Sequence, residues 1–138
     1  MRKTILFLLV VSASACGGGK KTDATANLLN GTWIPVRQEM GGTALQEAAF
    51  KTQSLVISDT NYTFSAESVD KGSVTYKGDK MDIYGRDGVN AGKHFAALYK
   101  YENGQLTICY NLKGDGYPPS FDTKGHPLYF LCVFTRKI

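Results

Sequence analysis

The sequence predicts an all-β protein: an eight-stranded, antiparallel, up-and-down barrel with one short helical piece. Three observations predict it. Apolar and polar residues alternate with a period of two over most of the chain after residue 27. Turn residues divide this pattern into about eight short runs. Only residues 44–50, which are rich in alanine, favour a helical turn. Consecutive strands joined by tight turns are typical of a barrel or a sandwich, and closure into a barrel removes the exposed edges.

The predicted strands follow one another along the chain. They occupy residues 32–39, 53–58, 62–67, 72–78, 81–85, 93–102, 105–112 and 128–138. Pro35 marks an irregular or edge position in the first strand, because proline cannot donate to a sheet ladder. Asn103 and Gly104 form the strongest hairpin signal. The last strand is apolar on both faces, so we expect it to be covered on both sides or to lie where the barrel closes.

The beginning of the chain is typical of a secretory signal. Residues 1–15 combine two basic residues, an apolar stretch and an Ala-Ser-Ala cleavage site, and they are too few for a spanning helix. Cys16 follows directly. The arrangement resembles the lipobox of bacterial lipoproteins, with Ala13 where leucine is usual. The resemblance implies that Cys16 becomes the acylated N-terminus and carries more than one chain. Ordinary signal cleavage, with Cys16 incidental, is the alternative.

The residues after the cysteine predict a flexible tether. Residues 16–26 are rich in glycine, then polar, and have no apolar period that could bury a core. A tether beside Cys16 favours an anchor at that residue. We therefore expect an outer-membrane lipoprotein of the bacterial cell envelope, attached to the membrane through Cys16. Residues 27–138 then form the barrel domain, which is long enough to bury a core without disulfides.

Charge and motifs argue against several classes of function. The formal net charge of +4 falls to +2 when the two basic residues of the signal are removed, which does not favour nucleic-acid binding. His94 and His126, the two histidines, lack metal-ligand spacing. Asp79, Asp82 and Asp87 do not match a calcium-binding loop. No nucleophile elbow or phosphate loop occurs. We expect no enzyme activity, no cofactor and no metal.

Two cysteines remain in the predicted domain. Cys109 and Cys132 both lie in strand-like runs near the end of the chain. An extracytoplasmic setting allows them to form a disulfide across neighbouring strands if the register fits. The alternative is two small buried apolar side chains.

The first and last strands carry a family resemblance. Gly31 and Trp33 open the first strand as a Gly-x-Trp motif, and Arg136 stands at the end of the last strand. This pattern resembles the calycin superfamily, the lipocalins and their relatives. The resemblance implies that Trp33 packs under Arg136 and closes the base of the barrel, where an arginine over an indole gains cation–π stacking.

A closer resemblance is to an uncharacterised bacterial lipocalin-like family that is often found in lipoproteins. Its motifs fall in order at Gly31 and Trp33, Lys71-Gly72, Met81-Asp82-Ile83, Tyr99, residues 104–109, residues 118–121 and Arg136. The family usually has an arginine before the proline of the long loop, and Tyr117 stands there instead. A second resemblance, to META-type envelope domains, shares the Gly-Thr-Trp strand but lacks their Gly-Cys-Asn turn.

Two non-catalytic functions follow as expectations. In the first, the barrel binds or carries a small hydrophobic molecule. The candidate lining residues are aromatic: Tyr62, Phe64, Tyr76, Phe95, Tyr99 and Tyr110. Aromatic residues alternating on strands can equally be plain core. In the second, the protein is an interaction or inhibitor module that contacts an envelope protein through the loop at residues 113–127.

Overall fold

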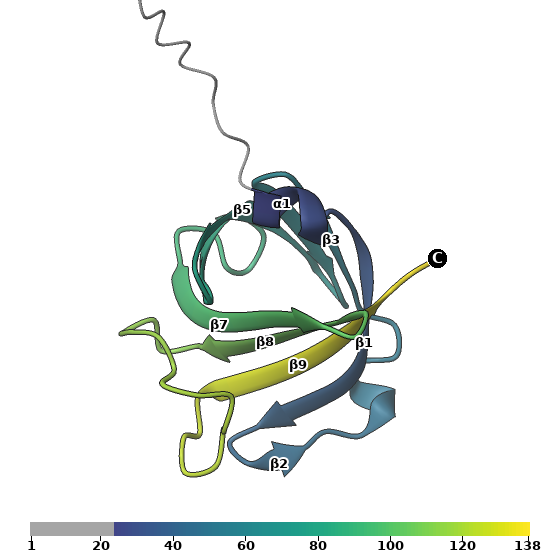
Figure 1. Ribbon diagram of the computed structural model, residues 1–138. Helices are drawn as coiled ribbons and strands as arrows, with labels where there is room; N and C mark the ends of the chain where they lie inside the picture. Colours follow the sequence, from purple (N-terminus) through teal and green to yellow (C-terminus); the bar gives the residue numbers. More distant parts are fainter. Residues whose placement is uncertain (1–23) are drawn as a thin grey trace, which may run out of the picture.

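Eight strands of the computed structural model wind into a closed barrel, and the structure describes residues 24–138 (Figure 1). A short helix, α1 (Ala24–Leu29), precedes the first strand. The wall consists of β1 (Gly31–Met40), β3 (Ser54–Ser58), β4 (Asn61–Ser65), β5 (Val69–Lys77), β6 (Lys80–Asp87), β7 (His94–Glu102), β8 (Gln105–Asn111) and β9 (Tyr129–Arg136).

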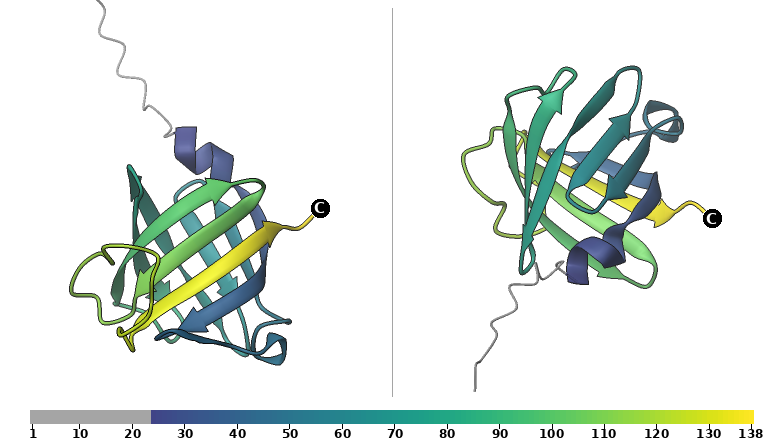
Figure 2. Two further views of the ribbon diagram at one scale, coloured as in Figure 1. Left: turned by 60° about the horizontal axis from the view of Figure 1, so that its bottom comes forward. Right: turned by 90° about the horizontal axis from the view of Figure 1, so that it is seen from above.

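Every neighbouring pair in this wall is antiparallel, and β1 pairs with both β3 and β9, which closes the barrel (Figure 2). The remaining strand, β2 (Thr43–Ala44), pairs only with the end of β1. The predicted all-β, eight-stranded, up-and-down barrel is therefore confirmed. The order of the strands in the wall is their order in the sequence, as expected when most connections are short.

The helical pieces differ in part from the prediction. Within the predicted turn at residues 44–50, the structure forms a single 3-10 turn, η1 (Glu47–Ala49). The sequence does not predict α1, which takes up the last residues of the segment assigned to the tether. Ala26 and Leu29 are buried there, one helical turn apart. The folded domain therefore begins at least three residues before position 27.

Alternation of side chains builds the interior. On β8 and β9, Leu106 lies opposite Phe134 and Ile108 lies opposite Cys132, and all four are almost completely buried. The same face of each strand supplies the central core cluster of the described residues. Pro35 lies at a point where the register between β1 and β9 shifts, so the predicted irregularity is a bulge within the barrel wall.

The outer face of β8 and β9 carries a second apolar layer. Cys109 and Leu131 lie opposite one another on this face, and both are buried. The connection between the two strands, residues 112–128, folds back beside the wall (Figure 2). Pro118 and Thr123 of this connection are buried. The last strand is therefore covered on both sides, as its composition predicts.

Two hydrogen bonds tie this connection to the far end of β1. The Thr123 hydroxyl donates to Glu39 Oε1 at 2.5 Å. It also accepts the backbone N–H of Gly42 at 2.8 Å. Because Thr123 is completely buried, these bonds satisfy a polar group that would otherwise be costly. The long loop is thus a part of the packed domain.

The two cysteines of the described domain do not form the disulfide that the sequence leaves possible. Both are free and buried. Cys132 lies opposite Ile108 and faces the interior, whereas Cys109 lies opposite Leu131 and faces outward. Their side chains leave the sheet in opposite directions, so the two sulfur atoms cannot be bridged although the strands are neighbours. The alternative, two small buried apolar side chains, matches the structure.

In the part of the chain that the structure describes, no helix is both long and apolar enough to cross a membrane. Cys16, the signal at residues 1–15 and the first part of the tether lie outside the described residues.

Candidate functional site

The base of the barrel is closed by the pair that the sequence singles out. Trp33 and Arg136 are register partners on β1 and β9, and Arg136 Cζ lies 4.3 Å from the centroid of the Trp33 ring. The guanidinium also donates hydrogen bonds to the carbonyl oxygens of Leu28, at 2.8 Å, and of Asn30. One arginine thereby joins the last strand, the first strand and the end of α1.

Trp33 is bound from its other side as well. Its indole Nε1 donates to the carbonyl oxygen of Leu29 at 2.9 Å, and its ring packs edge-on against Tyr101 with 5.7 Å between centroids. The side chain is completely buried and does not line the interior cavity. The described geometry therefore gives Trp33 a structural place, at the seal between the first and last strands.

The contact between Trp33 and Arg136 also depends on a glycine at position 31. Its φ is 140°, in a region that other residues rarely adopt. A Cβ at this position would lie 2.5 Å from Arg136 Nη1. A glycine therefore leaves the space in which the guanidinium reaches the backbone of residue 30. The three predicted closure residues come together at one contact.

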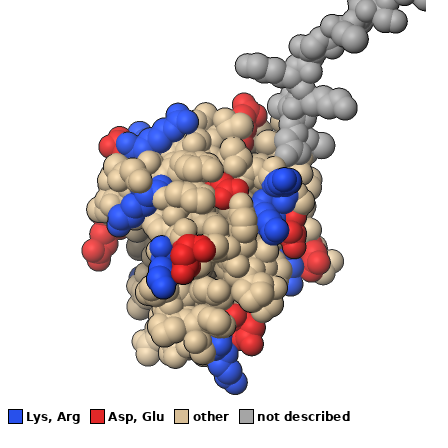
Figure 3. Space-filling view, turned by 90° about the vertical axis from the view of Figure 1, so that its left-hand side faces the viewer, with Lys and Arg blue, Asp and Glu red and all other residues tan. Residues whose placement is uncertain are grey.

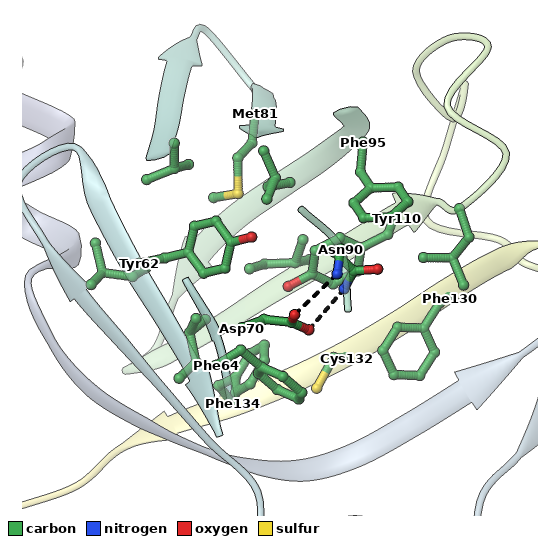
Figure 4. A pocket seen from close by; sticks show the side chains of 16 residues that line it. Tyr62, Phe64, Asp70, Met81, Asn90, Phe95, Tyr110, Phe130, Cys132 and Phe134 are labelled. Carbon is green, nitrogen blue, oxygen red and sulfur yellow. Dashed lines mark hydrogen bonds between the residues drawn. The ribbon is translucent and has the colours of Figure 1, made fainter. Parts of the chain in front are cut away.

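Above this seal the barrel encloses an apolar cavity of about 140 Å³ (Figure 4). Aliphatic and sulfur-bearing side chains from five strands form part of its lining, namely Leu55, Ile57, Val74, Met81, Ile83, Ile108 and Cys132. Aromatic rings form much of the rest, namely Tyr62, Phe64, Phe95, Tyr110, Phe130 and Phe134. The volume is close to that of a cavity known to hold one benzene molecule.

Of the six aromatic residues that the sequence predicts for the lining, four line the cavity and two do not. Tyr62, Phe64, Phe95 and Tyr110 line the cavity as predicted. Tyr76 and Tyr99 do not line it. Their rings pack edge-on against each other, 5.4 Å apart, and the Tyr99 hydroxyl donates to the carbonyl oxygen of Gly78 in the turn after β5. They are core residues nearer the closed end, which is the alternative that alternation on strands leaves open.

The sequence misses the two polar residues of the cavity, Asp70 and Asn90. Asp70 lies near the start of β5 and is only 7% exposed. One carboxylate oxygen accepts the backbone N–H of Asn90 at 3.2 Å, and the other accepts its side-chain amide at 2.8 Å. Extending the alternation of Val74 and Gly72 back by two positions would have placed Asp70 on the inner face. The charge and the glycine interrupt the apolar pattern that reveals strand faces.

Asn90 reaches the interior because the β6–β7 connection turns into the barrel mouth. Gly85, on the inner face of β6, makes room for it: a Cβ at Gly85 would lie 1.9 Å from the carbonyl oxygen of Asn90. The backbone of Gly85 exchanges hydrogen bonds with this connection, donating to Lys93 and accepting from Gly92, each at 2.9 Å. The hydrogen bonds between Asn90 and the Asp70 carboxylate thus hold the β6–β7 connection in the barrel mouth.

Burial raises the pKa values of three titratable groups that face the cavity. Desolvation, followed by the nearby negative charge of Asp70, raises the pKa of the Tyr62 phenol. Burial raises the pKa of Tyr110 well above its usual range. Burial also raises the pKa of Cys132 to about 12, although a hydrogen bond from Gln38 acts in the opposite direction. At neutral pH these three groups are uncharged, so the interior holds neutral phenols, a neutral thiol and one carboxyl group.

The mouth opens onto a shallow recess that shares part of the cavity lining. Phe95, Leu112 and Phe130 belong to both, and Met40 and Lys93 are among the other lining residues of the recess. A molecule in the cavity can therefore extend outward between the β6–β7 and β8–β9 connections.

A polar cluster on the outer wall holds the long loop. The Tyr117 hydroxyl donates to Asp82 Oδ2 at 2.6 Å, which raises the pKa of that phenol to about 12. Asp82 Oδ1 lies 2.7 Å from His94 Nε2, and His94 stacks on Tyr84 with 4.6 Å between centroids. Lys80 Nζ lies 5.1 Å from the centre of the Tyr117 ring. These contacts fasten residue 117 to β6 and β7.

The outer surface mixes charges of both signs. On the face drawn in Figure 3, basic and acidic side chains alternate in small groups among uncharged residues. Among residues 24–138, no three His, Cys, Asp or Glu side chains form a group that could hold a metal ion. Comparison of the chain with protein-family models, with curated proteins and with solved structures found no match.

Proposed function

We propose that this protein binds a small apolar molecule inside its barrel and carries it in the bacterial cell envelope, as its lipocalin-like resemblance implies. The observation that carries the proposal is the cavity of about 140 Å³ above the Trp33–Arg136 seal. Its walls are rings and aliphatic chains from strands all around the barrel. Apolar walls with few polar groups are typical of small-molecule sites.

The size of the cavity limits the ligand. Sites for drug-sized ligands usually measure about 300–1,000 Å³, whereas a cavity of about 150 Å³ accepts a single benzene ring. The portion of the ligand that enters the barrel is therefore a single ring or a short aliphatic chain. The recess at the mouth provides room for a further group outside the cavity.

Energetics favour an occupant. An empty enclosed core cavity costs about 24 cal/mol per Å³, so a space of about 140 Å³ that opens at a mouth costs at most about 3 kcal/mol of stability. This amount is a large part of the free energy of unfolding of a small domain. A barrel retained only for its stability gains from filling this space with larger side chains, whereas a binding protein needs the space open.

We place the protein on the outer membrane through Cys16. The support for this proposal is the signal at residues 1–15 and the lipobox-like sequence before the cysteine. Metabolic labelling with an alkyne fatty acid, followed by membrane fractionation, tests it. We expect label on the full chain and none on Cys16→Ser. Equal labelling of both would contradict the anchor.

The alternative is an interaction or inhibitor module that uses residues 113–127, and it has weaker support. The rings of that loop already have partners within the molecule. Tyr117 is bound to Asp82, and the Phe121 ring lies 4.9 Å from Lys100 Nζ. We therefore rank ligand binding first, and binding rather than catalysis.

The binding proposal is tested by what the protein retains. The full chain bearing Cys16→Ser, which cannot be acylated at that residue, is purified without detergent and examined by native mass spectrometry. The organic extract of the same sample is then analysed by gas chromatography and mass spectrometry. We expect a bound small molecule at a fixed ratio to protein. A protein that is consistently ligand-free, and that takes up no small aromatic molecule when challenged, would contradict the proposal.

A further inference from the structure

The cavity contains a single charged side chain. Of the 16 residues that line it, Asp70 is the only Asp, Glu, Lys or Arg. The carboxylate is 7% exposed and sits at the mouth end of an otherwise apolar space. Burying a charge in such surroundings is costly unless it is paired and hydrogen-bonded.

The hydrogen bonds that Asp70 accepts within the described structure come from neutral groups. Both come from Asn90, one from its backbone N–H and one from its side-chain amide. An ionised carboxylate has about four acceptor positions, so two bonds leave it able to accept more. Figure 4 shows the carboxylate in the middle of the lining residues, with the Tyr62 and Tyr110 rings nearby. Tyr62 is a close neighbour of Asp70, because it lies on the adjacent strand opposite Gly72, two positions from Asp70.

The aromatic walls favour the same kind of ligand. Six rings surround the space. The face of an aromatic ring attracts a cation, and cages of such rings recognise ammonium groups. A carboxylate ligand would instead meet the like charge of Asp70 in a water-poor site, where repulsion is strong.

We infer that the barrel selects a small organic ammonium compound, an apolar ring or short chain bearing a protonated amine, with Asp70 as the residue that accepts its N–H groups. The inference rests on the proposed function, because it requires that the cavity binds a ligand. It adds the ligand's charge, which an apolar cavity by itself does not determine. The bond between a protonated amine and Asp70 is charge-assisted and hence stronger than a neutral one.

Asp70 also has a structural role, and the test must distinguish this role from ligand binding. Through Asn90 it also holds the β6–β7 loop in the barrel mouth. A loss of binding in Asp70→Asn could therefore come from the loop and not from the charge. Asn90→Ala is the matched control, because it removes the side-chain bond to the loop and keeps the carboxylate.

The experiment uses three probes of nearly equal shape: benzylamine, benzyl alcohol and benzoate. Binding to the full chain bearing Cys16→Ser is measured by isothermal titration calorimetry at pH 7. We expect benzylamine to bind roughly tenfold or more tightly than benzyl alcohol, and benzoate to bind most weakly. We expect Asp70→Asn to remove the preference for the amine. Asn90→Ala also changes the cavity lining, so we expect it to weaken the binding of all three probes by a similar factor and to keep the preference for the amine.

Each result decides a separate question. If benzyl alcohol binds as tightly as benzylamine, the charge inference is wrong while the proposed function stands. The same holds if Asn90→Ala loses the amine preference as completely as Asp70→Asn. If none of the three probes binds, the proposed function itself fails. Should Asp70→Asn not fold, the carboxyl carbon signal of Asp70 in the parent chain decides: we expect it to shift with benzylamine and not with benzyl alcohol, and no shift would overturn the inference.

Discussion

At the scale of the residue, the stacking of Arg136 on Trp33 is the contact that holds the first and last strands together. The arginine contributes in three ways: it packs on the indole, and it donates to two backbone carbonyl oxygens. A lysine ammonium lacks the planar fork, so it cannot stack flat on the indole while it donates to both carbonyl oxygens. The role is thus specific to arginine, and Gly31 is the residue that leaves room for it.

We predict that Arg136→Ala lowers the free energy of unfolding by about 2–3 kcal/mol, since it removes a cation–π contact and two charge-assisted hydrogen bonds. Denaturant unfolding measures the change. The matched control is Arg86→Ala, an exposed arginine on β6, for which we expect a change within about 0.5 kcal/mol. Equal changes in the free energy of unfolding would show that Arg136 stabilises the barrel no more than an exposed arginine does.

A second residue-scale prediction concerns pH and Cys132. Burial raises the pKa of this thiol from 9.0 to about 12. Below pH 9 the thiol is protonated in both states, and its contribution to stability is fully present. As pH rises from 9 towards 12, the unfolded thiol ionises first, which favours unfolding. Stability should therefore fall over this range.

The comparison of the parent chain with Cys132→Ala isolates this effect from other groups that titrate in alkali. We expect the difference between their free energies of unfolding to shrink steadily above pH 9, as measured by urea unfolding at several pH values. A difference that is independent of pH would mean that the thiol is not desolvated.

At the scale of the element, residues 112–128 are the least regular part of the domain and yet are firmly attached. Tyr117 binds Asp82 on β6, and Thr123 binds Glu39 on β1. The loop covers the outward residues of β8 and β9, among them the buried Cys109. Its role is that of an outer layer of the core.

We predict that Tyr117→Phe loosens this loop without unfolding the barrel. The substitution removes one hydrogen bond to a carboxylate at the surface, which we expect to cost about 1 kcal/mol. Hydrogen–deuterium exchange should become faster in residues 113–121 and stay unchanged in β8. Tyr84→Phe is the control, because that exposed phenol lies on the same outer wall and stacks on His94. Identical exchange in the two variants would contradict the anchoring role of Tyr117.

The sequence predicts the elements well where side-chain alternation and turn residues act together. All eight barrel strands arise in this way, and so does the cover over the last strand. The prediction fails where the decisive contact is distant in sequence. The sequence does not identify Asp70 as a lining residue, because Gly72 interrupts the apolar pattern of β5. It does not predict α1, because six residues are too few to show a helical period. The sequence leaves open whether Cys109 and Cys132 pair, because composition does not reveal the register of β8 and β9, in which Cys109 lies opposite Leu131.

At the scale of the whole molecule, the barrel is sealed at one end and hollow at the other. The seal uses the first and last strands, and the hollow lies among rings supplied by β4, β7, β8 and β9. Closure of the wall satisfies the backbone of every barrel strand, so the interior can remain partly open without exposing sheet edges. The apolar cavity is therefore compatible with a stable fold, at a cost of at most about 3 kcal/mol.

The central claim is that a small apolar molecule occupies this cavity. The most direct measurement is a titration of the full chain bearing Cys16→Ser with toluene, followed by NMR of the methyl groups of Ile83 and Ile108, which line the space. We predict saturable shifts of both methyl groups. The shifts should vanish in Val74→Phe, which fills the cavity, and persist in Val69→Phe, which changes an exposed position on the same strand. Methyl signals that do not respond to toluene, or that respond equally in both variants, would contradict the account.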